Sequence, residues 1–370
     1  QTCALPISLM HTDQQSLALE KARQDAEDND PLIAGAALWT MGRAIQTHKL
    51  NDCDLNACVA GLINKTREAP TEIQQAAISA VAHASLKDER LILELVRLSV
   101  EHGDYTLAVI ANFLFMNQQD LLVSSPHFKP LLKSLVGLSP SQENAIKNFD
   151  WLLNQLYAKS EHRPLVLDCL TEWIIQNGSS SLNNKALIEL FDQTIMQIAN
   201  DQPGFQAVIT RWLVAPEKQL AVAIGELIGY LHIHGVKSPT FSPEVLNTFT
   251  SQDFRFLARR LLGYVISEES LLSLTFSLLE TDNAQERSFA WVYSLLTEEV
   301  GRDYGHATME ALKVRQKTAN SPERDLLIQI HDVLFQRSSA MDNLPRLQEL
   351  RPPMRLQRAI ALNRAREMQS

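Results

Sequence analysis

The chain has 370 residues, of which 45% are hydrophobic and 21% are charged, and its formal net charge is −9. This composition excludes a disordered chain, and the length exceeds the usual size of one core, so we expect two domains or an elongated array. Only 13 Gly and 15 Pro interrupt a sequence rich in helix formers, which favours helices over a β-sandwich or barrel. No stretch is apolar over the roughly 18 residues that a membrane span needs, so we expect no membrane association.

The four cysteines are Cys3, Cys53, Cys58 and Cys169. Their spacing matches neither a disulfide framework nor a paired CxxC zinc site. We therefore expect free thiols in a reducing compartment, the cytoplasm, with Cys53 and Cys58 buried or half-buried.

Both ends of the chain look artificial. Residues Gln1–Ser8, QTCALPIS, match the translation of a sequencing adapter, and we interpret them as a non-native scar. The alternative is a genuine irregular N-terminus. From Pro353 a helical pattern continues to Ser370 with no Gly or Asn cap and no Pro stop, so we expect that the natural protein extends beyond both ends.

Good helix formers between His11 and Asp28 predict the first helix. Asn29 and Asp30 then interrupt it, and Asp30 followed by Pro31 predicts an N-cap and the first residue of a new helix. This second segment, DPLIAGAALWTMGRAIQ, combines helically spaced apolar residues with small ones that let a neighbouring helix approach. Its predicted buried positions are Ile33, Ala36, Ala37, Met41 and Ala44.

The same apolar pattern recurs along the chain. A helix predicted over Cys53–Arg67 is followed, 40 positions after the first copy, by a second copy with Ile73, Ala76, Ala77, Ile78, Val81 and Ala84. A helix predicted over Leu91–Glu101 precedes a third copy that starts at Asp104, with Leu107, Ile110, Ala111 and Phe115. A recurring apolar face at such intervals predicts stacked helix pairs that share one continuous core.

The middle of the chain is less regular. Helices are predicted over residues 141–159, 164–176 and 183–200, and prolines punctuate the segment before them. Gly178–Ser181 is the best candidate for a flexible joint. We therefore expect two regions of helical repeats, 9–177 and 182–350, followed by a basic helix over 351–370.

Two further copies of the pattern follow. One begins at Glu217, with Leu220, Ala223, Ile224, Ile228 and Gly229, and the other at Ser251, with Phe254, Leu257, Ala258, Leu262 and Gly263. The stretch Lys237–Pro243 between them is predicted to be a loop. Apolar periodicity predicts helices over 271–279, 284–300, 308–316, 322–335 and from 353 onward, and no strand pattern is present, so the predicted class is all-α.

The segment DPLIAGAALWTMGRA resembles the second helix of HEAT repeats, in which Asp-Pro precedes a helix that carries a pair of small residues. The resemblance covers three units near the N-terminus and two after Glu217. The arginine usual near Asp-Pro is absent from the first copy, where Ala34 and Gly35 stand, and only Arg255 in the last copy approaches it. The resemblance implies a right-handed α-solenoid of antiparallel helix pairs, of the HEAT and armadillo type, with an irregular middle.

No residue pattern indicates catalysis or a cofactor. His232 and His234 are two positions apart and point in different directions on a helix, which disfavours a shared metal. Phosphate loops, nucleophile elbows and HExxH motifs are absent from the sequence. We therefore expect no catalytic, metal-binding or cofactor-binding residues. The five tryptophans are expected to be core or packing residues, and they are Trp39, Trp151, Trp173, Trp212 and Trp291.

Charge separates the end of the chain from its body. Gly301–Ser370 carries 12 Lys and Arg against 8 Asp and Glu, a balance of +4, whereas the remainder carries 22 against 35, a balance of −13. The candidate contacts for phosphates or an acidic partner are Arg351, Arg355, Arg358, Arg364 and Arg366, with Lys313, Arg315 and Lys317. The alternative, which we favour, is a solvated helix face or a contact with the acidic body of the chain itself.

The repeat pattern and the lack of a chemical motif predict a non-enzymatic scaffold that binds a protein partner or forms the interaction arm of a larger protein. A DNA-binding enzyme resembling HEAT-like glycosylases is a second hypothesis, although the acidic body disfavours binding to nucleic acid. A third is that the chain is the regulatory part of an enzyme whose catalytic domain lies outside it.

Overall fold

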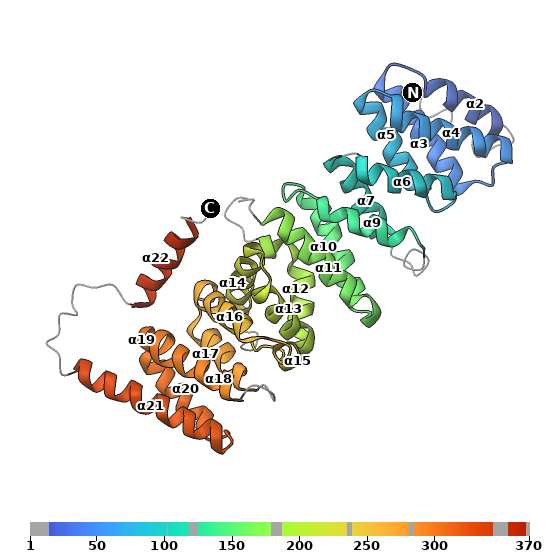
Figure 1. The fold of residues 1–370 in the computed structure, drawn as a ribbon. Coiled ribbons are helices and arrows are strands. Elements are labelled where there is room, and N and C mark those ends of the chain that lie inside the picture. The colour runs from blue at the N-terminus through green and yellow to red at the C-terminus, as the bar shows by residue number, and fades with distance from the viewer. Residues whose placement is uncertain are drawn as a thin grey trace. The chain divides into compact units, whose positions relative to one another are not determined.

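The computed structural model describes residues 15–101, 103–117, 125–178, 187–234, 239–280, 285–342 and 354–367. All regular secondary structure in these residues is helical, which confirms the all-α class (Figure 1). None of the helices they form combines the length and the hydropathy that crossing a membrane requires. The predicted scar, Gln1–Ser8, lies outside the described residues, as do positions 179–181 of the predicted joint.

The chain divides into two compact units. Unit 1 comprises Gln1–Asn183 with Leu190–Thr194, and unit 2 comprises Asn184–Glu189 with Ile195–Ser370. Two elements, η3 (Leu187–Phe191) and α12 (Asp192–Asn200), therefore include residues of both. The repeat regions predicted over 9–177 and 182–350 stay a prediction.

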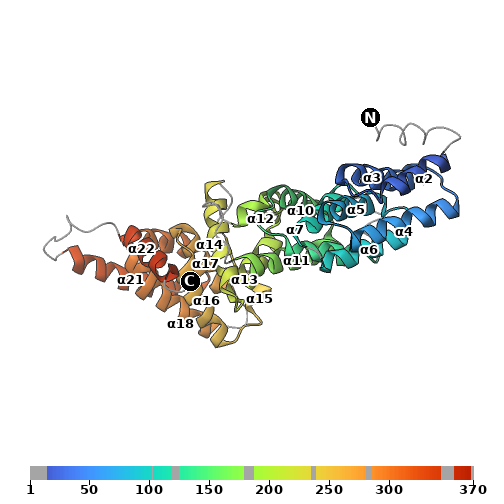
Figure 2. The same cartoon turned by 90° about the horizontal axis from the view of Figure 1, so that it is seen from above.

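Unit 1 is built from two layers of helices. Its elements in chain order are α2 (Gln15–Asp25), α3 (Pro31–Thr47), α4 (Asp52–Glu68), α5 (Thr71–Ala84), α6 (Glu89–Glu101), α7 (Asp104–Met116), α9 (Phe128–Ser134), η1 (Leu135–Gly137), α10 (Glu143–Tyr157), η2 (Ser160–His162) and α11 (Arg163–Asn177). In Figure 2, α3, α5, α7 and α10 follow one another in one layer, and α4, α6 and α11 lie in the other. We call the first group the α3–α10 layer, in which each helix packs against the next.

The start of α3 agrees with the sequence prediction. Asp30 is the N-cap, and its Oδ1 accepts a hydrogen bond of 2.9 Å from the backbone N–H of Leu32. Pro31 is the first helical residue. The buried stripe differs by about one position from the predicted one, because Ile33 and Ala36 are only half-buried. Its buried members are Ala34, Ala37, Leu38, Met41, Ala44 and Ile45.

Helices α3 and α5 approach each other through residues with little or no side chain. A Cβ built on Gly42 would lie 2.8 Å from the backbone oxygen of Ala80 in α5, too close for any larger residue without a shift. At Gly35, one end of the same contact, a Cβ would meet the Ala76 Cβ at 3.4 Å, an ordinary van der Waals distance. Gly42 therefore sets how near the two helices lie.

A buried carboxylate joins α4 to α6. Glu94 is only 4% exposed, and it accepts hydrogen bonds from Thr66 Oγ1 at 2.8 Å, from Arg67 Nη2 at 2.7 Å and from Arg97. Burial by itself would raise the pKa of Glu94, but the hydrogen bonds from Arg97, Arg67 and Thr66 outweigh it and hold the pKa at about 2, below the usual 4.5. Glu94 is thus ionised and fully partnered at neutral pH.

The irregular middle contains a second buried carboxylate. Asp150 in α10 accepts hydrogen bonds from the backbone N–H groups of Thr194, at 2.9 Å, and Gln193, at 3.1 Å, and so holds the first turn of α12. Burial raises the pKa of Asp150 to about 6 in spite of these bonds. Nearby, the fully buried Trp173 donates its indole N–H to the Leu138 oxygen at 2.9 Å and packs edge-on against Phe191. Polar contacts and aromatic packing hold this region together where the repeat pattern is weak.

The regular secondary structure in the described residues of unit 2 is also helical. Its elements are α13 (Gln202–Val214), α14 (Lys218–Ile233), α15 (Pro243–Leu246), α16 (Ser251–Tyr264), α17 (Glu268–Ser277), η4 (Leu278–Glu280), α18 (Gln285–Ser294), η5 (Leu295–Val300), α19 (Gly301–Asp303), α20 (Gly305–Gln316), α21 (Ser321–Asp342) and α22 (Met354–Glu367). Helix α13, which packs against α14 and α16, was not predicted from the sequence.

The two late copies of the pattern lie on α14 and α16. Their predicted apolar residues are buried except at Leu262, which is half-buried while the adjacent Leu261 is buried. Of the two predicted glycines, Gly263 is half-buried and Gly229 is exposed. The tight backbone approach is at Gly225, whose Cβ would lie 2.5 Å from the Tyr264 oxygen, whereas Gly229 and Gly263 have no such neighbour within 4 Å. The glycine that matches Gly42 in the pattern therefore does not make the close contact here.

We expect Gly42→Ala to lower the free energy of unfolding by about 1–2 kcal/mol, because overlap with the Ala80 backbone exceeds the gain in helix propensity. Gly35→Ala, in the same helix, is the matched control and should raise it by up to about 1 kcal/mol. Denaturant unfolding followed by circular dichroism measures both. Equal stabilities for the two variants would contradict the close approach of α3 and α5 at Gly42.

Glu94 predicts a specific dependence on pH. Because its folded-state pKa is depressed, its contribution is present above pH 4.5 and is lost as the pH falls from 4.5 towards 2. Glu94→Gln should cost about 2 kcal/mol at pH 6, and the difference from wild type should shrink steadily below pH 4.5. Glu101→Gln, which removes an exposed partner of Arg97, should change stability little at any pH. A wild-type advantage that is constant from pH 6 to 3 would refute this role of Glu94.

Candidate protein-binding face of unit 1

The α3–α10 layer exposes large aromatic side chains. Helices α4, α6 and α11 lie on one side of this layer in Figure 2. Three helices of the layer carry exposed aromatic residues, of which Trp39 is 40%, Tyr105 40% and Trp151 47% exposed. We call the surface formed by these three residues and His83 the open face. Trp173 and Trp212 are buried, as expected of core residues, whereas Trp39 and Trp151 are too exposed to belong to the core. Both lie beside the buried stripe of their helices, which periodicity alone does not distinguish from the core.

Trp39 connects α3 to α5 on the open face. Its ring lies against that of His83, with centroids 4.6 Å apart and an angle of 32° between the planes. Partial burial, together with the nearby Arg43, lowers the pKa of His83 below its usual value. A neutral imidazole at physiological pH therefore continues the aromatic surface from one helix to the next.

Tyr105 makes the corresponding link between α7 and α5. Its hydroxyl oxygen lies 2.9 Å from Ser79 Oγ, within hydrogen-bond distance, and it donates to the backbone oxygen of Gln75 at 3.2 Å. These contacts hold the phenol ring across the face of α5. Aromatic side chains thus bridge three successive helices.

The face continues onto α10. The buried positions of α7 correspond to those of α10 at an interval of 39, and at that interval Asn112 corresponds to Trp151. Amide side chains surround this tryptophan, exposed at Asn144 and Gln155 and half-buried at Asn148 and Asn154. Because amides both donate and accept hydrogen bonds, they match the polar groups of a peptide backbone.

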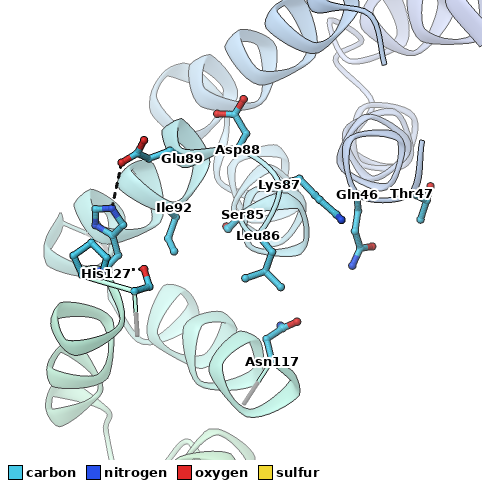
Figure 3. A pocket seen from close by; sticks show the side chains of 12 residues that line it. Gln46, Thr47, Ser85, Leu86, Lys87, Asp88, Glu89, Ile92, Asn117 and His127 are labelled. Atoms are coloured by element: carbon cyan, nitrogen blue, oxygen red, sulfur yellow. Dashed lines mark hydrogen bonds and ion pairs between the residues drawn. The ribbon is translucent and has the colours of Figure 1, made fainter. Parts of the chain in front are cut away.

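Unit 1 contains a cavity of about 870 Å³ (Figure 3). Helices α3, α5 and α7 end at it, and α6 and α9 begin at it. Its lining includes Gln46 at the end of α3, Leu86 after α5, Ile92 in α6 and Asn117 after α7. Figure 3 shows the side chains of Leu86 and Ile92 directed into the space between these helices.

Charged groups surround the cavity. Glu89 Oε1 lies 3.8 Å from His127 Nε2 across its rim. Asp88 accepts hydrogen bonds from the Arg90 side chain, and these hold the pKa of Asp88 below its usual value although burial opposes them. Lys87 lies between these groups and the end of α3.

The structure describes the side chains of two of the five predicted contact arginines, Arg358 and Arg366. Both side chains contact other residues of unit 2. Arg358 lies 3.2 Å from Asp303, donates to the Leu262 oxygen at 3.1 Å and packs over a tyrosine ring. Arg366 donates to the Tyr264 oxygen at 3.5 Å. Arg351 lies outside the described residues, and so do the side chains of Arg355 and Arg364. These contacts agree with the alternative of an attachment to the chain's own body, while binding to an anion or partner stays a prediction.

The basic residues before them also have acidic neighbours. Lys313 pairs with Glu310 at 2.8 Å, and Arg315 pairs with Glu323 at 2.7 Å. Lys317 is exposed. The described part of the predicted basic patch is therefore largely neutralised within unit 2.

Among the described residues, the cysteines and histidines do not form a reactive site. Burial raises the pKa of Cys58 to about 11 and that of Cys169 to about 12, so both remain protonated thiols at neutral pH. Cys53 is exposed, which corrects the expectation that it is buried or half-buried. The His234 ring packs against Tyr230. Within the part of the chain that the structure describes, no three His, Cys, Asp or Glu side chains are placed to share a metal ion.

Comparison with models of protein families gives no match to this chain, and comparison with curated proteins gives none. The evidence for a binding face is therefore the exposure and chemistry of three side chains, Trp39, Tyr105 and Trp151. None of the three was predicted from the sequence to be a site residue.

The exposed tryptophans should contribute less to folding than a buried one. We expect Trp39→Ala and Trp151→Ala to lower the free energy of unfolding by about 1–3 kcal/mol each, because 40% and 47% of their surface stays exposed to water. Trp173→Ala, the buried counterpart, should cost about 3–5 kcal/mol. Chemical denaturation of the three variants tests this. A cost for Trp39→Ala or Trp151→Ala as large as that for Trp173→Ala would mean that the residue belongs to the core.

Proposed function

We propose that the chain is a HEAT-like, right-handed α-solenoid of antiparallel helix pairs that binds a protein partner and catalyses no reaction. The observation that carries this proposal is the row of exposed aromatic side chains on the α3–α10 layer, from Trp39 through His83 and Tyr105 to Trp151. Large exposed aromatic side chains are typical of protein interfaces.

The helix contacts of unit 1 support the solenoid. Short connections join helices that pack against each other, such as the two residues between α4 and α5, and this is typical of antiparallel pairs. Successive members of the α3–α10 layer then pack side by side at sequence intervals of 34–40 residues, as stacked repeats do. Small residues at these contacts, above all Gly42, allow the close stacking.

The arrangement of the open face supports protein binding. Tryptophan and tyrosine contribute most of the binding energy in many interfaces, and here they are spread over three helices of the layer rather than gathered in one pocket. Exposed and half-buried amides on α10 flank Trp151 and can pair with a partner's backbone. Such a surface fits a partner segment that extends across several helices.

Affinity capture tests this proposal. The full chain is used as bait beside a face variant, Trp39→Ala with Trp151→Ala, and a control variant, Leu93→Ala with Val100→Ala, which removes exposed apolar side chains from α6 in the other layer. We expect a protein that wild type and control capture equally and that the face variant captures at least about tenfold less. No specific partner in extracts of several hosts, or a partner indifferent to both tryptophans, would count against the proposal.

A further inference from the structure

Three helix ends of the same polarity meet at the cavity. The last residues of α3, α5 and α7 are Thr47, Ala84 and Met116, and the cavity is lined at all three ends. The last four carbonyl groups of a helix lack partners within it, and the macrodipole places a partial negative charge there. The cavity therefore lies where three partial negative charges converge.

Acidic side chains oppose the positive end of α6, which also lies at the cavity. Asp88 Oδ1 accepts the backbone N–H of Arg90 at 2.9 Å, and the Asp88 carboxylate is paired with the Arg90 side chain at 2.6 Å. Glu89, in the first turn of α6, is therefore the acidic group of the rim that no arginine neutralises in the described residues. The side chain of Glu89 is 80% exposed, so its carboxylate is accessible from the cavity rim. Lys87 is the basic side chain of the rim, and in Figure 3 it reaches toward Gln46 at the end of α3.

The spacing along α3 and α5 relates the cavity to the open face. Gln46 follows Trp39 by two turns of α3, so the two lie on the same side of that helix, and Leu86 follows His83 by three residues at the end of α5. Leu86 and Ile92 give the cavity an apolar wall of the kind that packs against the aliphatic stem of a long basic side chain. A partner segment lying across the open face would thus bring its neighbouring side chains to the cavity mouth.

We propose that this cavity binds the arginine or lysine side chain of an extended peptide segment of the protein partner, and this rests on the function proposed above. The volume of about 870 Å³ lies within the range of small-ligand sites and leaves room for adjoining backbone. Residues 15–178 carry 14 Lys and Arg against 20 Asp and Glu, a charge of −6, which attracts a basic segment. Arg43 and Lys147 are exposed one helical turn from Trp39 and Trp151, so we expect a partner's cation to be favoured at the cavity rather than beside these tryptophans.

The experiment uses the full chain and N-acetyl-arginine amide as the probe, with N-acetyl-leucine amide and N-acetyl-glutamine amide as uncharged references. Saturation-transfer NMR and titration measure binding. We expect the arginine probe to bind more tightly than either reference, Glu89→Gln to weaken it about threefold, and Lys87→Gln to strengthen it about threefold, since Lys87 competes for the same field. Glu72→Gln makes the same charge change at the other end of α5 and should leave binding unchanged.

Several results would overturn the proposal: an arginine probe that binds no better than the references, a weaker affinity in Lys87→Gln, or equal effects of Glu89→Gln and Glu72→Gln. Circular dichroism of the variants checks that these surface changes leave the fold intact. If a captured partner requires Trp39 and Trp151 but binds the Glu89→Gln and Lys87→Gln variants as well as wild type, the open face is the binding surface and the cavity is not part of it. If the partner requires neither tryptophan, the proposed function itself is contradicted.

Discussion

The close approach of α3 and α5 at Gly42 is the constraint on which the rest of unit 1 depends. Because the Ala80 backbone leaves no room for a Cβ there, the two helices lie nearer than side chains would otherwise allow. The short distance between α3 and α5 brings Trp39 into contact with the His83 ring. Packing of α7 on α5 likewise brings Tyr105 within hydrogen-bond distance of Ser79. A wider spacing would separate these side chains and divide the open face into unconnected helices.

Two buried carboxylates, Glu94 and Asp150, join helices at contacts that are not made by small residues. Glu94 ties α6 to α4 through two donors of α4, Thr66 and Arg67, and Asp150 ties the first turn of α12 to α10 through two backbone N–H groups. The two differ in their electrostatics. Charged arginines compensate the burial of Glu94, whereas Asp150 has only neutral donors, so its pKa rises to about 6. Each is a contact between elements far apart in sequence that periodicity does not reveal.

Features that depend only on residues adjacent in the sequence could be predicted from it. The N-cap at Asp30 is local chemistry, and it is confirmed. The exact buried stripe of α3 depends on where α4 and α5 lie, so it was displaced by about one position. Helix α13 was missed because Pro203 and Gly204 stand in its first turn, where they read as a loop although proline is tolerated there. The exposure of Trp39 escaped prediction because an aromatic residue beside an apolar stripe has the same pattern whether or not another layer covers it.

The glycine contacts of the two units differ by one helical turn. In unit 1 the bare backbone is needed at Gly42, and in unit 2 it is needed at Gly225, four residues before the matching Gly229. If α3 replaced α14, the side chain of Leu38 would stand where Gly225 meets the Tyr264 oxygen. Copies that match in pattern are therefore not interchangeable parts: each has become specific to its own neighbour, and a chimaera that exchanges them would have to exchange the facing helix as well.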